Sequence, residues 1–432
     1  MVQHLDEKKR CESLKYSVKD GVAYAVMENT GTSYISPLAI AMNASTGYIG
    51  FLASLPGLIS SLLQGYAIRL MEKRDRKEMI LQSVFWQALL WLPIALIALI
   101  HRQNSLSLLM FFYIALISFN ALIIPAWNSW MKDIVTKKSC QYFGNRNRIS
   151  GLAGIATLLA AGYFLDISKK FNLVFLGFSI IFIIAAYARI ISRYYLSKQY
   201  EPKFKLDKRY YFTLPQFIKK SRSNNFGRFT IYLAFAYFAV FFASPFITVY
   251  MLRDMKLSYS VFTMLNVTQA LAMFVAMPLW GKFADKYGNL KSIKIGGLLI
   301  SFIPLLWMFS KNIPYLIVVQ IFSGIVWASF NLSSSNFIYD AVSRERMGIC
   351  VAYSNIFSTF GMFVGSIAGG FLAGIIKTQY NPLMLLFLIS AVLRLVIYLI
   401  MIPHIKEVRA VEKFNFKDIL LAHLPLQNHR TR

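Results

Sequence analysis

Charged residues are scarce in this chain. Asp, Glu, Lys and Arg make up 15% of its 432 residues, and only 19 of them are acidic. A soluble domain typically has about a quarter of its residues charged. Hydrophobic residues instead make up 57% of the chain and aromatic residues 16%, and the mean hydropathy is +0.51. This composition excludes an ordinary soluble domain and is typical of a membrane protein.

Cysteine is also rare. Cys11, Cys140 and Cys350 are the only three, and they form no CxxC pair. This spacing indicates neither a zinc site nor a disulfide framework. We expect ordinary reduced thiols, since stable disulfides belong to oxidising compartments and all three fall on the expected cytoplasmic side.

Motifs of known catalysts are missing. The chain contains no HExxH, P-loop, GxSxG or GxGxxG sequence. The five histidines lie in the tails or at the ends of apolar segments: His4, His101, His404, His423 and His429. We therefore expect no enzyme activity, no metal site and no cofactor. Without a Walker loop, ATP is not expected to supply energy.

The N-terminal stretch "MVQHLDEKKRCESLKYSVKD" lacks the short apolar core and the small-residue cleavage site of a signal peptide. The first apolar helix is therefore expected to act as the insertion signal.

Long apolar segments dominate the rest of the chain. A transmembrane helix needs about 20 mostly apolar residues, because its backbone polar groups must bond within the helix. Charge clusters and Gly, Pro or Asn turns divide the chain into twelve expected spans. They are residues 18–43, 46–70, 78–100, 105–131, 141–165, 171–195, 228–252, 258–281, 291–310, 313–339, 347–376 and 382–403. The predicted fold class is an all-α membrane protein with twelve transmembrane helices in two pseudo-symmetric six-helix bundles.

Five parts follow along the chain. They are an N-terminal tail (1–17), a six-helix bundle (18–196), a basic linker (197–227), a second six-helix bundle (228–403) and a C-terminal tail (404–432). Within the linker, Leu214 to Ile218 fits either a short amphipathic helix on the inner membrane surface or a plain solvated segment.

Basic residues are distributed asymmetrically. Of 46 Lys and Arg, 38 fall on the side of the termini and 7 on the other side, with Arg394 inside the last span. By the positive-inside rule, both termini are expected to be cytoplasmic in the cell membrane. The net charge of +27 then reflects topology and attraction to anionic lipid. No separate basic domain is left to bind nucleic acid.

The two halves echo each other faintly. Asp133 and Asp340 lie 207 positions apart, each at the inner end of a fourth span, and Arg189 and Arg394 lie 205 positions apart near the inner ends of the sixth and twelfth spans. Such matches at equivalent topological places indicate a duplicated six-helix unit.

The connection "GKFADKYGNLK" (281–291) between the eighth and ninth spans resembles the signature loop of the major facilitator superfamily. The resemblance covers about residues 18–403. It implies two bundles that alternate access to a central cavity lined mainly by the first, fourth, seventh and tenth spans. The first-half counterpart is degenerate, with Arg69 in place of the aspartate and Glu72 in place of the second glycine.

The same resemblance implies a conformational latch. Gly281 is expected to allow close helix approach, and Gly288 to supply the positive φ of a tight turn. Asp285, followed by the basic Lys286, is expected to face the start of the fifth span in the other half. The helix dipole there and Arg146 or Arg148 favour an anion. The alternative is that Asp285 caps its own turn.

Polar residues deep in the expected cavity spans are candidates for binding substrate or protons. They are Glu28, Thr32, Asn120, Trp127, Asn128, Tyr237, Asn331 and Asn336. Asn120, Trp127 and Asn331 equally fit hydrogen-bonding roles between helices.

Glu28 lies about 15 Å into the first span at 1.5 Å per residue. An acid at that depth can bind a proton on one side of the membrane and release it on the other, or it can be a buried partner that holds helices together.

The sequence thus predicts a monomeric secondary transporter that moves a small organic solute, with protons as a candidate coupling ion. Aromatic and amide residues on the cavity spans favour efflux of an amphipathic compound. Uptake of a sugar or other polar metabolite, and a transporter-like sensor without transport, remain as alternatives. A lipid-acting membrane enzyme is disfavoured by the absence of clustered acids, Ser/His pairs and metal ligands.

Overall fold

Every regular element described in the computed structural model is a helix. The description covers residues 2–71, 74–100, 104–135, 139–202, 214–221, 224–342, 346–376 and 381–412. Within these ranges, eleven helices are long and apolar enough to cross a membrane. The remaining expected span, 18–43, consists of three consecutive helical segments and contains Asp20 and Glu28. The predicted all-α membrane fold is confirmed.

The N-terminal half begins with α1 (Val2–Met27), a π-helical turn η1 (Glu28–Thr32) and α2 (Ser33–Ala41). Five long helices follow: α3 (Thr46–Leu70), α4 (Arg76–Ile100), α5 (Ser105–Ile134), α6 (Ser139–Lys170) and α7 (Val174–Ser197). Since α1 is already helical from Val2, most of the segment expected to be a tail extends the first helix.

The C-terminal half repeats this order. Its seventh span consists of α9 (Asn225–Phe241), α10 (Ser244–Val249) and the π-helical turn η2 (Tyr250–Asp254). The other spans are α11 (Tyr259–Tyr287), α12 (Asn289–Phe309), α13 (Ile313–Ala341), α14 (Met347–Ile375) and α15 (Pro382–Met401), which ends in the 3-10 turn η3 (Ile402–His404).

A short helix, α8 (Leu214–Ser221), lies in the linker. Its Phe217 is buried against Phe226, Tyr353 and Phe357. The segment is therefore helical, as one of the two interpretations predicted, and the helix is anchored to the C-terminal half through Phe217. Its position on the inner membrane surface stays a prediction.

The first span of each half is interrupted, at a different depth in each. The first passes from α1 into η1 at Glu28, and the seventh breaks between α9 and α10, just before Pro245. Proline has no N–H group and cannot continue the preceding helical hydrogen bonding. Interrupted helices expose backbone and side-chain polar groups near the middle of a membrane protein, where transporters place their sites.

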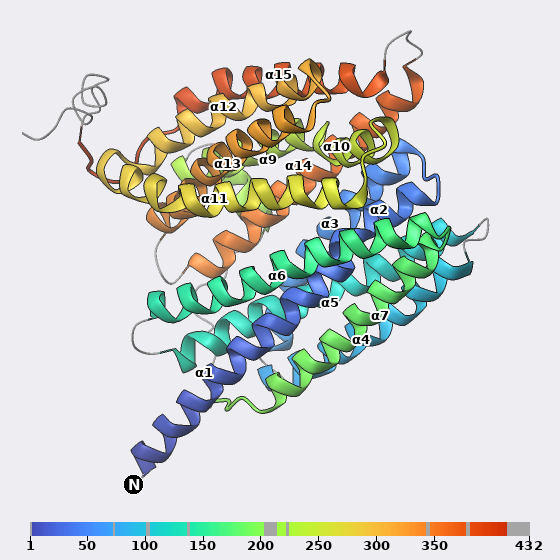
Figure 1. Ribbon diagram of the computed structural model, residues 1–432. Helices are drawn as coiled ribbons and strands as arrows, with labels where there is room; N and C mark the ends of the chain where they lie inside the picture. The colour runs from blue at the N-terminus through green and yellow to red at the C-terminus, as the bar shows by residue number, and fades with distance from the viewer. Residues whose placement is uncertain are drawn as a thin grey trace, which may run out of the picture.

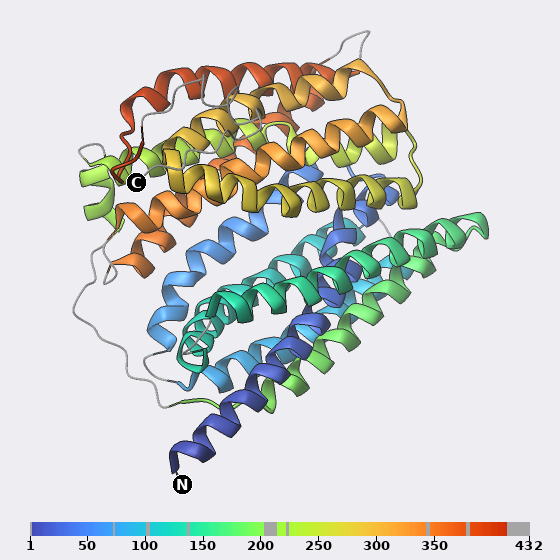
Figure 2. The same cartoon turned by 60° about the vertical axis from the view of Figure 1, so that its left-hand side comes forward.

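The halves contact each other mainly through two pairs of helices, α3 with α14 and α6 with α11 (Figure 1). We call the end of the molecule that holds the start of α1 and the segment 405–412 the terminal face, and the opposite end the distal face. In both views α6 and α11 are close together towards the distal face and diverge towards the terminal face (Figure 2).

Candidate functional site

A cavity of about 390 Å³ lies on the inner side of the C-terminal half, beside the break in the seventh span. Its lining comes from α9 to α13 and α15 and is rich in aromatic and amide side chains. These are Tyr237, Phe241, Trp307 and Trp327 among the aromatics, and Asn266, Gln269, Gln320 and Asn331 among the amides. This lining can pack apolar rings while presenting a few hydrogen-bonding groups, as small-molecule sites do.

A second cavity of about 400 Å³ lies between the two halves. The N-terminal half contributes Gly57, Ser61 and Gln64 of α3, and the C-terminal half contributes residues of α9, α13 and α14. Ser61 also contacts Thr359 of α14 directly, with 2.7 Å between their hydroxyl oxygens. Because this cavity is walled by both halves, its shape must change when they move relative to each other.

Tyr237 and Asn331 line both cavities. They were selected from the sequence as cavity residues, and the structure places them where the two hollows meet. A solute that passed from one cavity to the other would touch both side chains.

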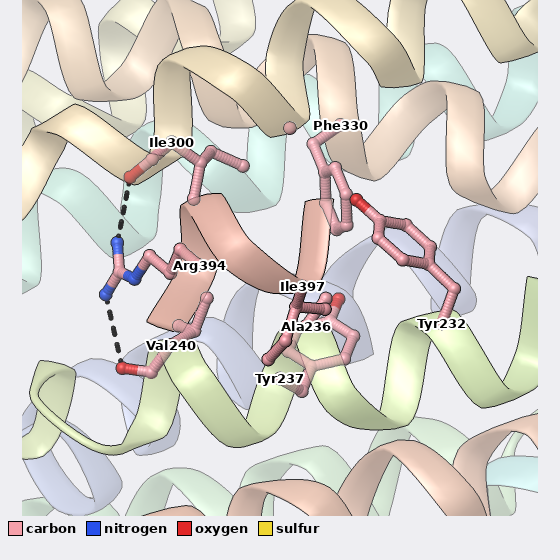
Figure 3. Close-up of a pocket in the computed structure, with 9 residues that line it drawn as sticks. Tyr232, Ala236, Tyr237, Val240, Ile300, Phe330, Arg394 and Ile397 are labelled. Carbon is pink, nitrogen blue, oxygen red and sulfur yellow. Dashed lines mark hydrogen bonds between the residues drawn. The ribbon is translucent and has the colours of Figure 1, made fainter. Parts of the chain in front are cut away.

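A small hollow of about 20 Å³ lies behind the first cavity, around Arg394 of α15. The guanidinium group donates to the carbonyl oxygens of Ile300 at 3.0 Å and Val240 at 3.2 Å (Figure 3). Its Nε donates to the Ser390 hydroxyl at 3.1 Å. Arg394 therefore links α15 to α12 and to the end of α9.

Glu28 lies in η1 and is partly buried. The Thr32 hydroxyl donates to its carboxylate at 3.3 Å, and the Tyr24 hydroxyl lies beside it. The structure therefore brings together two residues selected from the sequence, Glu28 and Thr32. Neither lines any of the three cavities described above.

A buried polar network lies beside Glu28 in the N-terminal half. The Ser192 hydroxyl donates to Asp20 at 2.7 Å, and Arg189 donates to Ser192 at 3.0 Å and to Gln87 at 2.9 Å. Gln87 in turn donates to Asn120 at 2.8 Å. Asn120 therefore makes an interhelical hydrogen bond, one of the two roles open from the sequence.

Arg146 extends this network from α6. It lies 3.5 Å from the Asp20 carboxylate and donates to the Ser17 carbonyl at 3.1 Å. Its guanidinium carbon lies 4.5 Å from the centre of the Trp127 ring, a cation–π contact. In this conformation Arg146 and Trp127 serve contacts within their own half.

The remaining residues selected from the sequence are more peripheral. Asn128 and Arg148 are exposed, and Asn336 is partly buried. None of the three lines the cavities described above.

The loop between α11 and α12 has the tight turn that its glycine predicts, with φ of +97° at Gly288. The expectation at Gly281 is wrong for this conformation. An added Cβ there would meet only the Leu332 side chain at 3.8 Å, an ordinary van der Waals distance, so no close helix approach requires glycine.

Asp285 is 77% exposed and forms an ion pair with Arg409 at 3.7 Å. Arg409 also pairs with Asp340 at 3.1 Å, while Lys286 lies 3.8 Å from Glu412. The segment 405–412 thus contacts the expected latch residues in this conformation and leaves Asp285 largely exposed. Contact of Asp285 with the start of α6 remains a prediction for a state that is closed at the terminal face.

A contact of the expected kind does exist at the distal face. Asp166, near the end of α6, accepts hydrogen bonds from the backbone amides of Tyr259 and Ser260, both at 2.8 Å, and from the Ser260 hydroxyl. Nearby, an added Cβ at Gly162 would come within 2.6 Å of the Thr263 hydroxyl. The helices are therefore in close contact here, and an acid of one half caps the start of a helix in the other.

Sequence reasoning did not select Asp20 or Asp166, and noted Arg189 and Arg394 only for their spacing. A signal existed for Asp20, which lies eight residues before Glu28 and so on the same helical face. Asp166 had a weaker sequence signal, because it is an acidic residue at the end of an expected span.

Comparison with known proteins assigns this architecture to a family. The family model described as Major Facilitator Superfamily matches residues 21–226 and 229–428. Multidrug resistance protein 2 of Bacillus subtilis (strain 168) is 24% identical over 123 residues, which are 28% of this chain and 31% of that protein. The alignment thus spans about a third of that relative's length.

Solved structures share the fold at low sequence identity. A mutant of the nucleoside transporter NupG has a TM-score of 0.70 at 14% identity, over 91% of this chain and all of that one. A bacterial homolog of the human lysosomal transporter Spinster, in an inward-facing and unoccupied conformation, has a TM-score of 0.65 at 14% identity, over 92% of this chain and 99% of that one.

Proposed function

The chain belongs to the major facilitator superfamily and is a secondary transporter, and we propose that it exports an amphipathic organic compound by alternating access. The observation that carries this proposal is the pair of cavities that meet at Tyr237 and Asn331. One is lined by aromatic rings and amides, and the other is walled by both halves.

The proposed cycle is a rocking of the two halves. The present conformation is joined at the distal face through Asp166, and its halves diverge towards the terminal face (Figure 2). Opening of the distal face would break the Asp166 bonds, and closure of the terminal face would bring Asp285 towards the start of α6. Two such states expose one central site alternately.

We propose that protons drive the cycle through Glu28. This acid lies at an interruption of the first span, beside Tyr24 and within electrostatic range of the buried Arg189. A change in the charge of Glu28 would alter its interaction with Arg189, which is tied to α4 through Gln87. The alternative remains that Glu28 only holds helices together.

We further propose that the protein acts as a monomer in the cell membrane, with both termini and the 197–228 segment cytoplasmic. The asymmetry of 38 to 7 basic residues supports this orientation. In that orientation the two halves diverge towards the cytoplasm (Figure 2), which is the side from which an exporter takes its substrate.

A second candidate function is uptake of a polar metabolite. The four amides around the first cavity favour it, since Asn266, Gln269, Gln320 and Asn331 can together hydrogen-bond a hydroxylated solute. The match to part of a multidrug resistance protein supports export, whereas the likeness to NupG is one of fold.

A ligand screen on the purified protein tests the proposed site. Compounds that raise the melting temperature of the wild type should lose that effect in Tyr237→Ala and Asn331→Ala. Tyr339→Ala is the matched control, because Tyr339 also lies on α13 but is 59% exposed on the outer surface. Amphipathic hits that stabilise all four proteins equally would contradict the assignment, and hits confined to sugars and nucleosides would favour uptake.

A further inference from the structure

We propose that the cavity in the C-terminal half contains an anion-binding subsite at Arg394, so that the transported compound carries a carboxylate, sulfonate or similar acidic group. This inference rests on the proposed function in one respect, that substrate enters this cavity. It adds the charge of the substrate, which the family and the fold leave open.

Arg394 is a buried cation without an acidic partner. Its side chain lies in the middle of α15, 6% exposed. The three hydrogen bonds that it donates go to neutral oxygens, those of Ser390, Ile300 and Val240. Among the residues that the structure describes, no carboxylate forms an ion pair with it.

The equivalent arginine of the other half is balanced differently. Arg189 is also buried, at 2% exposed, but it is bonded to Ser192, which itself donates to the Asp20 carboxylate. The N-terminal half thus holds its buried arginine beside an acid, and the C-terminal half does not. Burial of an uncompensated charge is costly, and an anion brought to it lowers that cost.

Arg394 is placed where a ligand can reach it. It lines the 390 Å³ cavity, whose lining contains no Asp or Glu. Guanidinium has five N–H groups, and three are used by the bonds drawn in Figure 3 and the bond to Ser390. Two N–H groups remain to donate to an acid, and planar guanidinium binds carboxylate in a paired geometry.

The rest of the cavity selects the class of anion. Trp307, Phe241 and Tyr237 line the same space as Arg394. These rings suit an aromatic or otherwise flat apolar body, while Arg394 takes the acidic group. The fitting ligand is therefore an aromatic organic acid of modest size, in contrast to a cationic drug.

A purely structural role for Arg394 must be separated from this one. Ser390 donates to the Ala239 carbonyl at 2.6 Å and Arg394 to that of Val240, so α15 holds the end of α9 at the break in the seventh span. That role predicts lower stability on mutation of Arg394, but it predicts no preference for one ligand charge over another.

The test is a charge series of one aromatic body, measured by quenching of tryptophan fluorescence in the detergent-purified full chain. The three ligands are 2-naphthoate, the neutral 2-naphthamide and the cation 2-naphthylmethylammonium. The wild type should bind the carboxylate at least about ten-fold more tightly than the amide, as expected for a charge-assisted hydrogen bond, and the cation most weakly.

Variants locate the preference. Arg394→Gln should abolish the difference between carboxylate and amide, and Arg394→Lys should retain part of it. Arg193→Gln is the matched control, because it removes one positive charge from an exposed side chain of α7, one turn beyond Arg189, and should leave the preference intact. If Arg394→Gln does not fold, the wild-type series and Arg394→Lys still decide the question.

Four results would each overturn the proposed subsite. In the wild type they are equal affinity for the three ligands, a preference for the cation, or no binding of the carboxylate up to millimolar concentration. The fourth is a preference for the carboxylate that survives in Arg394→Gln. Export of neutral or cationic amphipathic compounds alongside any of these results would leave the proposed function standing. Carboxylate binding at Arg394 without export would support the subsite and contradict the proposed export function.

Discussion

Asp166 at the end of α6 accepts hydrogen bonds from both the backbone amide and the side-chain hydroxyl of Ser260 at the start of α11. The two residues belong to different halves of the transporter, and they meet at the distal face. These bonds cannot persist when the distal face opens. The hydrogen bonds of Asp166 therefore stabilise the conformation described here.

Replacement of Asp166 by Asn should shift the equilibrium away from this conformation. The amide still accepts one hydrogen bond but loses the charge, and hydrogen bonds to a charged group contribute about 1.5–3 kcal/mol. We expect a change of more than ten-fold in the ratio of the two states. Spin labels at Lys170 and Lys311 should report longer distances across the distal face in Asp166→Asn.

Asp254→Asn is the control for that experiment. Asp254 lies at the same face but accepts a hydrogen bond from Asn381 of its own half at 2.6 Å. Its replacement should leave the distance distribution unchanged. Indistinguishable distance distributions for Asp166→Asn and the wild type would show that the Asp166 hydrogen bonds do not determine the equilibrium between the two conformations.

Asp285 is predicted to act in the opposite state. In a conformation closed at the terminal face it should lie within hydrogen-bond reach of the first turn of α6, a charge-to-dipole contact of about 0.3–2 kcal/mol. Asp285→Asn should therefore increase the population of the present conformation. Labels at Asn147 and Lys282 should report a larger share of long distances across the terminal face.

Glu412→Gln provides the comparison, since Glu412 is 69% exposed near the same loop and contacts Lys286 without a predicted partner in the other half. Its distances should match those of the wild type. A terminal-face distribution that is the same in Asp285→Asn as in the wild type would remove the latch.

The positions of the helices could be predicted from the sequence better than the contacts between them. Helix positions follow from apolar runs and turn residues, so the twelve spans and the positive φ of Gly288 could be predicted. The signature loop predicted that Asp285, at the end of α11, meets the start of α6, whereas the contact of Asp166, at the end of α6, with the start of α11 was not predicted. Which end of the pair is closed is a property of the conformation, and no local pattern specifies it.

In the candidate site, too, the depth of a residue could be predicted from the sequence, but its contact partner could not. Tyr237 and Asn331 were selected because they are polar and deep in cavity spans, and they do line both cavities. Asn120 met the same criteria but is bonded to Gln87 of a neighbouring helix. Helical periodicity gives the face of a residue, whereas its partner depends on how neighbouring helices are rotated. The contact of Arg409 with Asp285 depends on the path of a tail and has no periodic signal.

The orientation in the membrane is predicted from the basic asymmetry. A single cysteine at Tyr210, in a linker segment outside the described residues, should be labelled by an impermeant maleimide only in inside-out vesicles or after permeabilisation. A cysteine at Lys311, on the opposite face, should be labelled in intact cells. Labelling of position 210 from outside intact cells would reverse the topology.

Glu28→Gln tests the coupling role. If Glu28 carries the coupled proton, the amide mimics the protonated acid, so uphill transport and its pH dependence should vanish while substrate exchange persists. If Glu28 is a structural partner, the variant should lose stability, since breaking a buried pair costs about 3–5 kcal/mol, and surviving transport should keep its pH profile. Thr32→Val, which removes the hydroxyl bonded to Glu28, is the milder control. A stable Glu28→Gln protein with full pH-dependent accumulation would rule out coupling through this residue.

Proton-driven transport by the purified wild type is the most direct test of the whole account. Proteoliposomes with an acidic lumen should accumulate an amphipathic aromatic compound above its external concentration, and a protonophore should release it. The same vesicles without a pH gradient should only equilibrate the compound. Equilibration alone under both conditions, or no movement beyond that in protein-free liposomes, would contradict the proposal that this protein is a proton-coupled exporter.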